Sequence, residues 1–219
     1  MVRALGVAIA TGLFVPGSVL AQQVDAALKL GFYAPFGNVV EQGSKADPNT
    51  HYVQRLQATT AIGANVVVWT SGRLGIEGSI GYTPSNVAVE DSVSTRDERS
   101  SLVLAAVRVI YAFTPMYFGA RPGHREWDIP WSFYVGAGVG LANRSGEVWT
   151  SMYSSGFTAP ALTLDVGVRT ALGARVIFRM DLEDYISRAQ FDKGLPTETV
   201  AQLHNDAMFS ASLAYRFVR

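Results

Sequence analysis

The residues best placed to do chemistry in this chain are charged side chains that recur singly within apolar runs. In residues 175–185, RVIFRMDLEDY, apolar residues alternate with charged or polar ones. Alternation with a period of two indicates a β-strand that carries a different kind of residue on each face. Acids and bases that share one enclosed face form ion pairs, which either close an interior or line a pore. Eight residues make up this candidate network: Lys29, Glu77, Arg108, Asp165, Arg169, Arg179, Asp181 and Glu183.

Histidines are the usual acid–base catalysts near neutral pH, and the chain has three of them. His204 lies just before the last apolar run, and Ser210 and Ser212 follow it, but no His-x-Ser pattern surrounds any histidine. His51 lies in a polar segment with no partner nearby in the sequence. We therefore predict no catalytic residue. A hydrolase centred on His204 ranks last among the hypotheses, and a solvated histidine at the end of a loop is the better interpretation.

A metal site is suggested only by residues 124–128, where His124, Glu126 and Asp128 alternate. Metal sites need ligands that converge at a fixed spacing. These three residues lie in a turn flanked by proline and glycine, beside Arg121 and Arg125, so a solvated turn is the better interpretation. The chain contains no cysteine, which excludes a disulfide framework and thiolate ligands. We predict no metal and no cofactor.

The composition limits the classes of protein to which this chain can belong. Of the 219 residues, 48% are hydrophobic and 16% are charged, against a usual charged share of about 25%. Lys and Arg together number 18, as do Asp and Glu, so no net field favours nucleic acid as a partner. We find no phosphate-binding glycine loop and no nucleic-acid patch in the sequence. One domain with a large apolar surface is expected.

The first 21 residues predict export. Arg3 gives a basic start, an apolar run covers residues 4–15, and a Pro-Gly break precedes Val19 and Ala21. Small residues at the −3 and −1 positions are typical of a secretory signal peptide cleaved after Ala21. The apolar run is short for a membrane anchor, which needs about 20 residues. We expect a mature domain of residues 22–219, in which any membrane crossing is made by strands.

Alternating apolar runs recur eight times along the mature chain, and an even number of strands is the rule for single-chain bacterial barrels. Tight turns are expected at 71–73 and 171–173, and long polar connections alternate with them. The segment 114–130 is long where a short turn is expected. The predicted strands lie within residues 24–36, 56–70, 74–82, 101–113, 131–141, 161–170, 175–185 and 207–217, and the long connections within 37–55, 84–100, 143–159 and 188–206.

Glycine decides which face of these strands points inward. One face is rich in glycine and isolated charges, and the other is almost free of charge. Glycine weakens strands, so a solvent-facing surface has no reason to prefer it, whereas a narrow eight-stranded barrel needs the space. We therefore expect the charges of residues 175–185 inside and their apolar residues against lipid. Aromatic residues gather near the strand ends, which is typical of interfacial girdles: Tyr111, Phe113, Trp131, Tyr215 and Phe217 at one end, and Phe32, Tyr82 and Tyr153 toward the other. A secreted lipocalin-like barrel with the opposite facing is the alternative.

Three motifs, YVGAGVG, RMDLEDY and SLAYRF, together resemble the outer-membrane β-barrel domain proteins of the OmpA-like class. The resemblance covers most of residues 24–219 and implies an all-β, eight-stranded, antiparallel up-and-down transmembrane barrel in the outer membrane of a Gram-negative cell envelope. It also implies that outer-membrane lipid surrounds the barrel and that the barrel-assembly machinery recognises a terminal aromatic signal, here Tyr215 and Phe217. Val218 and Arg219 follow that signal, which departs from a terminal Phe. We expect no peptidoglycan-binding domain.

Two functions follow from this architecture, with the rim hydrolase as the third. The first is a non-enzymatic barrel that has a structural role or binds a surface partner through its loops, with its interior plugged by the charged network. The alternative is a small porin-like channel with weak anion preference, because the inward charges lean basic once Lys29 and Arg216 are counted. Residues 87–100 are charged and flexible in composition, and they are the candidate loop for a surface partner.

Overall fold

The computed structural model describes residues 23–36, 40–42, 52–90, 95–113, 131–146, 149, 157–173, 175–189 and 202–218. The predicted signal peptide, residues 1–21, lies outside the described residues, as do His51, the turn 114–130 with its His124, and Tyr153. Among the described residues, no helix is long and apolar enough to cross a membrane.

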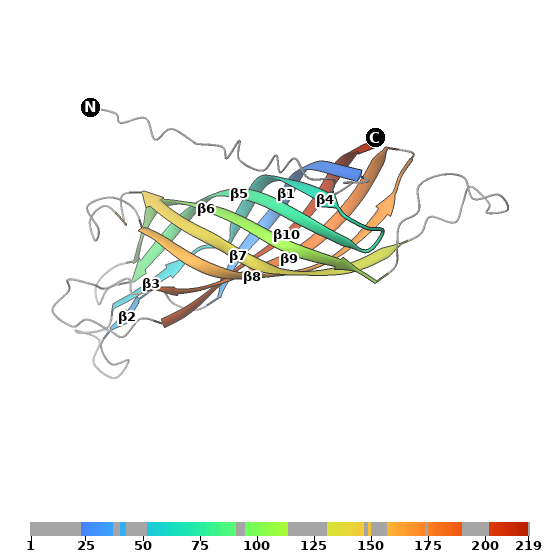
Figure 1. The fold of residues 1–219 in the computed structure, drawn as a ribbon. Coiled ribbons are helices and arrows are strands. Elements are labelled where there is room, and N and C mark those ends of the chain that lie inside the picture. The colour runs from blue at the N-terminus through green and yellow to red at the C-terminus, as the bar shows by residue number, and fades with distance from the viewer. Residues whose placement is uncertain are drawn as a thin grey trace, which may run out of the picture.

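Eight long strands close into an antiparallel barrel, which confirms the predicted fold (Figure 1). Each strand pairs with its neighbours in chain order, and the last strand pairs with the first to complete the ring. Two short strands, β2 and β3, precede β4 and extend the sheet beyond one rim. The strands are β1 (Gln23–Phe36), β2 (Val40–Gln42), β3 (Tyr52–Leu56), β4 (Thr59–Trp69), β5 (Leu74–Glu90), β6 (Thr95–Ala112), β7 (Ser132–Gly146), β8 (Phe157–Ala171), β9 (Val176–Ala189) and β10 (Gln202–Val218).

Tight turns join β4 to β5 and β8 to β9 at one end of the barrel, which we call the short-turn end. In the first, the Ser71 hydroxyl accepts hydrogen bonds from the amides of Arg73 and Leu74 at 3.3 and 2.9 Å. In the second, the amide of Leu172 donates to the carbonyl of Val176 at 2.9 Å. Serine side chains that satisfy nearby backbone amides favour such turns. Both turns lie where the sequence predicts them.

The strands run further than predicted at the opposite end, which we call the long-loop end. Strands β5 and β6 remain paired from Pro84 and Ser101 to Glu90 and Thr95, and β3 pairs with the last residues of β5. The prediction of a flexible loop over 87–100 is therefore wrong for residues 87–90 and 95–100. A charged composition favours disorder in an isolated segment. Here, however, each residue that extends an existing antiparallel ladder forms backbone hydrogen bonds with the strand already aligned beside it. We call β2, β3, residues 84–90 of β5 and residues 95–101 of β6 the sheet extension.

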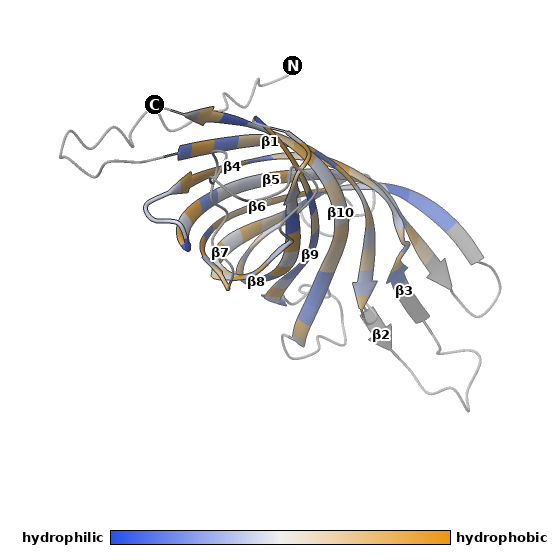
Figure 2. Ribbon diagram, turned by 90° about the vertical axis from the view of Figure 1, so that its right-hand side faces the viewer, coloured by the Kyte–Doolittle hydropathy of each residue, from blue (hydrophilic) through white to orange (hydrophobic). Residues whose placement is uncertain are grey.

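The two faces of the strands point as the sequence predicts. Figure 2 shows hydrophobic and hydrophilic residues alternating along the strands. On the outer face, Leu28 is 77% exposed and Val139 is 69% exposed, whereas Asp181 and Glu183 on the inner face are fully buried. An apolar outer surface of this extent is typical of a barrel in lipid. The charges of residues 175–185 that belong to the network, including Arg179, therefore lie inside.

Two charges of that stretch, Arg175 and Asp184, do not point inward, so the inward prediction is wrong for both. Asp184 lies on the outer face of β9, opposite the exposed Leu164 of β8. Arg175 precedes β9 and is exposed in the turn after β8. Its guanidinium donates a hydrogen bond to the hydroxyl of Tyr215 at 2.9 Å, and this hydrogen bond raises the pKa of Arg175 above its ordinary value. The side chain therefore anchors the turn to the outer surface at the short-turn end.

Aromatic rings stand on the outer face near the short-turn end, as the girdle prediction requires. Tyr111 and Phe113 are exposed and meet edge to face with ring centroids 5.6 Å apart. Tyr215 and Phe217 pair in the same way at 5.0 Å, and Trp131 is also exposed. Amphipathic rings prefer the membrane–water interface, so these residues mark one boundary of the lipid-facing band.

Arginine substitutions on the lipid face of β9 should show a dependence on depth. Met180 lies near the middle of the strand, and Val176 lies at its short-turn end, opposite Tyr215. Met180→Arg is expected to lower the free energy of unfolding by about 2–4 kcal/mol and Val176→Arg by only about 0–1, because the penalty for a charge falls toward the interface. Equilibrium urea unfolding in lipid vesicles measures both. Equal and small losses at the two positions would contradict the assigned facing.

Candidate functional site

The centre of the barrel holds an ion-pair network built around Glu77 of β5. One carboxylate oxygen of Glu77 accepts a hydrogen bond from Nη1 of Arg108 on β6 at 3.0 Å, and the other accepts from Nη2 of Arg179 on β9 at 2.8 Å. Asn65 of β4 donates to the same carboxylate at 3.0 Å. Arg179 also pairs with Asp181 at 2.8 Å. Four strands therefore meet at one buried carboxylate.

Glu183 forms the second hub of this central layer. It pairs with Nζ of Lys29, from β1, at 2.5 Å and with Nη2 of Arg108 at 3.1 Å. The hydroxyl of Tyr185 donates to it at 3.1 Å. Arg108 therefore bridges Glu77 and Glu183, and a continuous chain of pairs crosses the lumen. Six of the eight predicted network residues take part in it: Lys29, Glu183, Arg108, Glu77, Arg179 and Asp181.

Aromatic side chains complete the central layer. The hydroxyl of Tyr134 bonds to Asp181 and accepts from Nε of Arg179 at 3.0 Å, and the guanidinium of Arg179 lies 4.9 Å from the ring centroid. The ring fits because its neighbour on β8 is Gly167, where a Cβ would lie 2.2–2.6 Å from Tyr134 atoms. Glycine on the inner face thus creates the space that the sequence pattern suggests.

The other two predicted network residues, Asp165 and Arg169, are buried in the interior on β8 without joining this chain of pairs. Both carboxylate oxygens of Asp165 lack a hydrogen-bond partner, as do Nε and Nη1 of Arg169, among the described residues. The guanidinium of Arg169 stacks on Trp69, 3.8 Å from the ring centroid. The prediction therefore places all eight residues inside but does not distinguish the bonded six from these two.

A second polar layer at the short-turn end contains an acid that the sequence prediction missed. Asp25 accepts two hydrogen bonds from Arg216, from Nε at 2.8 Å and Nη2 at 2.9 Å. The indole of Trp69 donates to the same carboxylate at 2.8 Å. Asp25 lies two and four residues before Ala27 and Lys29 on the same inward face of β1, so the period-two pattern contains the signal for it.

A third polar layer lies at the long-loop end, in segments that the sequence assigns to loops. Asp206 accepts a hydrogen bond from the hydroxyl of Tyr33 at 2.5 Å and also pairs with Arg144. Trp149 is fully buried and donates to the hydroxyl of Ser100 at 2.8 Å. Polar composition around Arg144 and Asp206 suggests solvated loops, so no sequence signal identifies them as interior residues.

Apolar clusters separate the three polar layers. The cluster between the central layer and the long-loop layer includes Leu102, Leu104 and Met208. The cluster on the short-turn side includes Val67, Ile110 and Ala112, together with the rings of Trp69 and Tyr134, whose polar atoms belong to the adjoining polar layers. The described interior is thus a stack of polar, apolar, polar, apolar and polar layers, held by side chains from all eight barrel strands.

The charges of the described interior balance. Six carboxylates and six cationic groups are buried there. The sequence prediction of a basic lean counted Arg216 and Lys29 but not Asp25 or Asp206, which the structure also places inside. The acids are Asp25, Glu77, Asp165, Asp181, Glu183 and Asp206, and the bases are Lys29, Arg108, Arg144, Arg169, Arg179 and Arg216.

His204 lies inside the barrel rather than in solvent, which corrects the prediction of a solvated histidine. It is 7% exposed on β10 and directly opposite Ser187 of β9. A nucleophilic serine needs a hydrogen bond to its base, but the Ser187 hydroxyl has no partner among the described residues. Asp206, two residues further along, is bonded to Tyr33 and Arg144. Within the described ranges, no cluster of three or more His, Cys, Asp and Glu residues is arranged to hold a metal ion.

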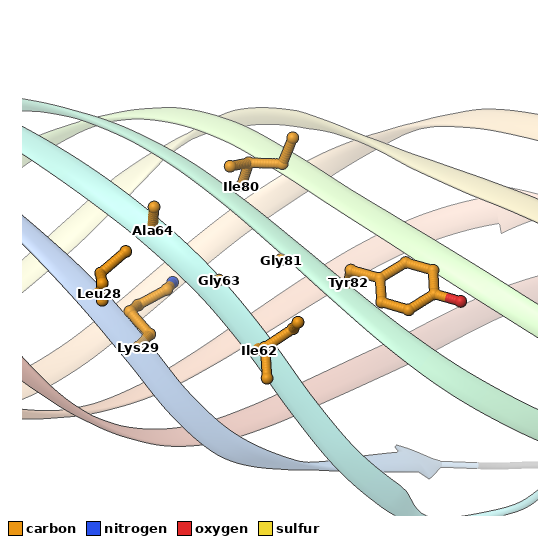
Figure 3. A pocket seen from close by; sticks show the side chains of 8 residues that line it. All are labelled: Leu28, Lys29, Ile62, Gly63, Ala64, Ile80, Gly81 and Tyr82. Carbon is orange, nitrogen blue, oxygen red and sulfur yellow. The ribbon is translucent and has the colours of Figure 1, made fainter.

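An apolar recess opens on the outer wall over β1, β4 and β5 (Figure 3). Its floor is the cross-strand pair Gly63 and Gly81. Leu28, Ile62 and Tyr82 stand around it. Lys29 also lines the recess, but its ammonium group is buried in the interior and paired with Glu183. The rest of the lining is apolar, so in a bilayer the recess is expected to face hydrocarbon.

Comparison with known proteins identifies the fold but no family. No protein-family model matches the sequence, and no curated protein matches it. Among solved structures, the outer membrane protein OprG from Pseudomonas aeruginosa has 12% sequence identity and a TM-score of 0.61, covering 90% of this chain and 97% of that one. The outer membrane protein AlkL has 15% identity and a TM-score of 0.54, with 90% and 92% covered. The fold is therefore that of the outer-membrane β-barrels, as the resemblance in sequence implies.

Proposed function

We propose that this protein is a non-enzymatic component of the outer membrane that has a structural role or binds a surface partner, and that its barrel is plugged. The observation that carries the proposal is the layered interior. Three polar layers and two apolar layers follow one another along the barrel. An eight-stranded barrel is just wide enough for side chains to fill, and large buried side chains such as Arg108, Tyr134 and Trp149 occupy that space.

A plugged barrel acts through what lies outside the bilayer, and the structure describes the sheet extension beyond the rim at the long-loop end. Its exposed residues include Arg55, Asp97 and Arg99, and Gln57 donates a hydrogen bond to Asp97 at 2.7 Å. Both signs of charge on a paired sheet suit a polar partner at the cell surface. The strands of this extension are paired with one another. A regular surface of this kind supports its role as an interaction surface better than a flexible loop would.

In this proposal, the barrel-assembly machinery binds the protein while the barrel is inserted into the membrane. Tyr215 and Phe217 are exposed on the outer face at the end of β10. They meet edge to face with ring centroids 5.0 Å apart and are accessible from the lipid side. This placement supports their role as the assembly signal.

A small channel is the second candidate, because some buried polar groups of the interior are unsatisfied. The hydroxyls of Thr163, Ser210 and Ser212 have no partner among the described residues. Buried polar groups are normally hydrogen-bonded to protein or water, so internal water is expected beside them. Linked waters would form a narrow path through the interior.

Conductance separates the plugged barrel from the channel. The refolded mature chain, residues 22–219, is inserted in a planar lipid bilayer, and resistance to added protease verifies insertion. We expect no discrete current steps, because the apolar layers interrupt any water path. As a matched test, Leu102→Gly with Leu104→Gly should introduce steps by opening the apolar layer at the long-loop end. Discrete, salt-dependent steps from the wild-type protein would establish the channel instead.

A rim hydrolase remains the last hypothesis. It requires that the wild-type protein hydrolyse lipid or peptide and that His204→Ala abolish this activity in a folded barrel. The buried His204 and the unbonded hydroxyl of Ser187 favour the non-enzymatic proposal.

A further inference from the structure

Asp165 is a buried acid at the centre of the barrel, and it has no hydrogen-bond partner among the described residues. It is 1% exposed, and neither carboxylate oxygen has a hydrogen-bond donor among the described residues. An ionised carboxylate that is shielded from bulk water and has no cationic partner is strongly unfavourable. Something must therefore compensate this group or neutralise it.

The cationic groups of the central layer are already committed to other acids. Three cations balance three carboxylates in this layer. The pairs are Lys29–Glu183, Arg108–Glu77, Arg108–Glu183, Arg179–Glu77 and Arg179–Asp181. Asp165 is a fourth acid in a layer whose other charges cancel.

The groups that face Asp165 from neighbouring strands add to the negative charge around it. On β9, Glu183 lies directly opposite on the ladder, and like charges in that position repel. On β7 its partner is Gly136, which has no side chain to donate a hydrogen bond. Arg169, on the same strand, is stacked on Trp69. The remaining charged and titratable groups around Asp165 are Glu77, Arg108, Tyr134, Arg179 and Asp181.

We propose that Asp165 is a proton-binding site, and that its carboxyl group is protonated in the folded barrel while the six partnered groups stay ionised. The proton comes from bulk water, adds to one carboxylate oxygen and changes no other bond. It removes the uncompensated charge and turns the acid into a hydrogen-bond donor toward the carboxylates that face it. A metal ion fits less well, because no described group of three acids or histidines is arranged as ligands.

This site would make the interior respond to alkaline conditions. Loss of the proton adds a fourth negative charge to a layer with three cations, which weakens the network by repulsion between Asp165 and Glu183. Aspartate and asparagine have nearly the same shape, so Asp165→Asn reproduces the protonated acid and removes the response.

Infrared spectroscopy of the full-length protein in lipid vesicles tests the proposal. We expect one carbonyl band of a protonated carboxyl group near neutral pH, which shifts in D2O, is lost in Asp165→Asn and is retained in the matched control Asp181→Asn. We also expect the stability of wild type relative to Asp165→Asn to fall as the pH rises above about 3.9, the ordinary pKa of aspartate, because the unfolded chain releases the proton that the folded barrel keeps. If the variant does not fold, carbon-13 NMR of wild type with labelled aspartate should show one protonated carboxyl group.

Two results would overturn this inference. One is the absence of any protonated carboxyl signal from the wild-type protein. The other is a signal that survives in folded Asp165→Asn. A wild-type protein without the band, but stabilised by sodium or potassium chloride relative to choline chloride, would mean that an alkali cation occupies the site in place of the proton. Conductance plays no part in this test, so its outcome is independent of whether the barrel is plugged.

Discussion

Glu77→Ala is expected to lower the free energy of unfolding by about 3–5 kcal/mol, the usual cost of removing one partner of a buried ion pair. Glu77 is fully buried and accepts hydrogen bonds from Arg108, Arg179 and Asn65. Its loss leaves Asp181 as the one acidic partner of Arg179 and Glu183 as the one acidic partner of Arg108 among the described residues, in a place that water reaches poorly. Equilibrium urea unfolding in lipid vesicles gives the difference.

The control for this variant is Asp97→Ala. Asp97 also accepts a hydrogen bond, from Gln57, but the pair is exposed on the sheet extension. Exposed polar substitutions usually change stability by no more than about 0.5 kcal/mol. Should Glu77→Ala be as mild as Asp97→Ala, the central layer must be hydrated, and the channel would become the leading function.

Gly167→Ala should be destabilising by about 1–3 kcal/mol, although it adds only one methyl group, because overpacking of a filled interior forces its neighbours to move. The new Cβ would lie 2.2 Å from Cζ and 2.3 Å from the hydroxyl oxygen of Tyr134. The ring would have to leave its hydrogen bond with Arg179. The unfolding free energy and the tyrosine fluorescence report the two effects.

Gly78→Ala is the matched control on another strand. A Cβ at Gly78 meets no atom within 4 Å, and glycine weakens strands, so this variant should be as stable as wild type or slightly more stable. If Gly167→Ala behaved in the same way, the ring of Tyr134 would not occupy the position described, and the central layer would be looser than its hydrogen bonds indicate.

The strands and their facing could be predicted from the sequence because both depend on local periodicity. Runs such as residues 131–141 have a period of two that allows one assignment of faces, and a shift by one residue would exchange them. Isolated charges such as Arg108 and Glu183 then fall on the inner face together with glycine. The tight turn at 71–73 was equally local, since Ser71 satisfies its own turn.

The pairing inside the barrel could not be predicted, because it depends on how eight strands are staggered around a ring. Nothing in the sequence near Glu77 indicates that it meets Arg179, which lies 102 residues later. Arg144 and Asp206 were missed because their polar neighbours suggest loops. The sheet extension was missed for a related reason, since its stability comes from pairing with strands that are already aligned.

The ion pair between Asp25 and Arg216 favours closure of the barrel in the correct register. These residues lie opposite each other on the first and last strands, 191 positions apart in the chain. They come together only when the ring closes, so the pair is expected to form late in folding. A slip by one residue would turn Arg216 toward lipid and leave Asp25 buried without its cation. We therefore expect misregistered closure to be less stable than closure in the correct register.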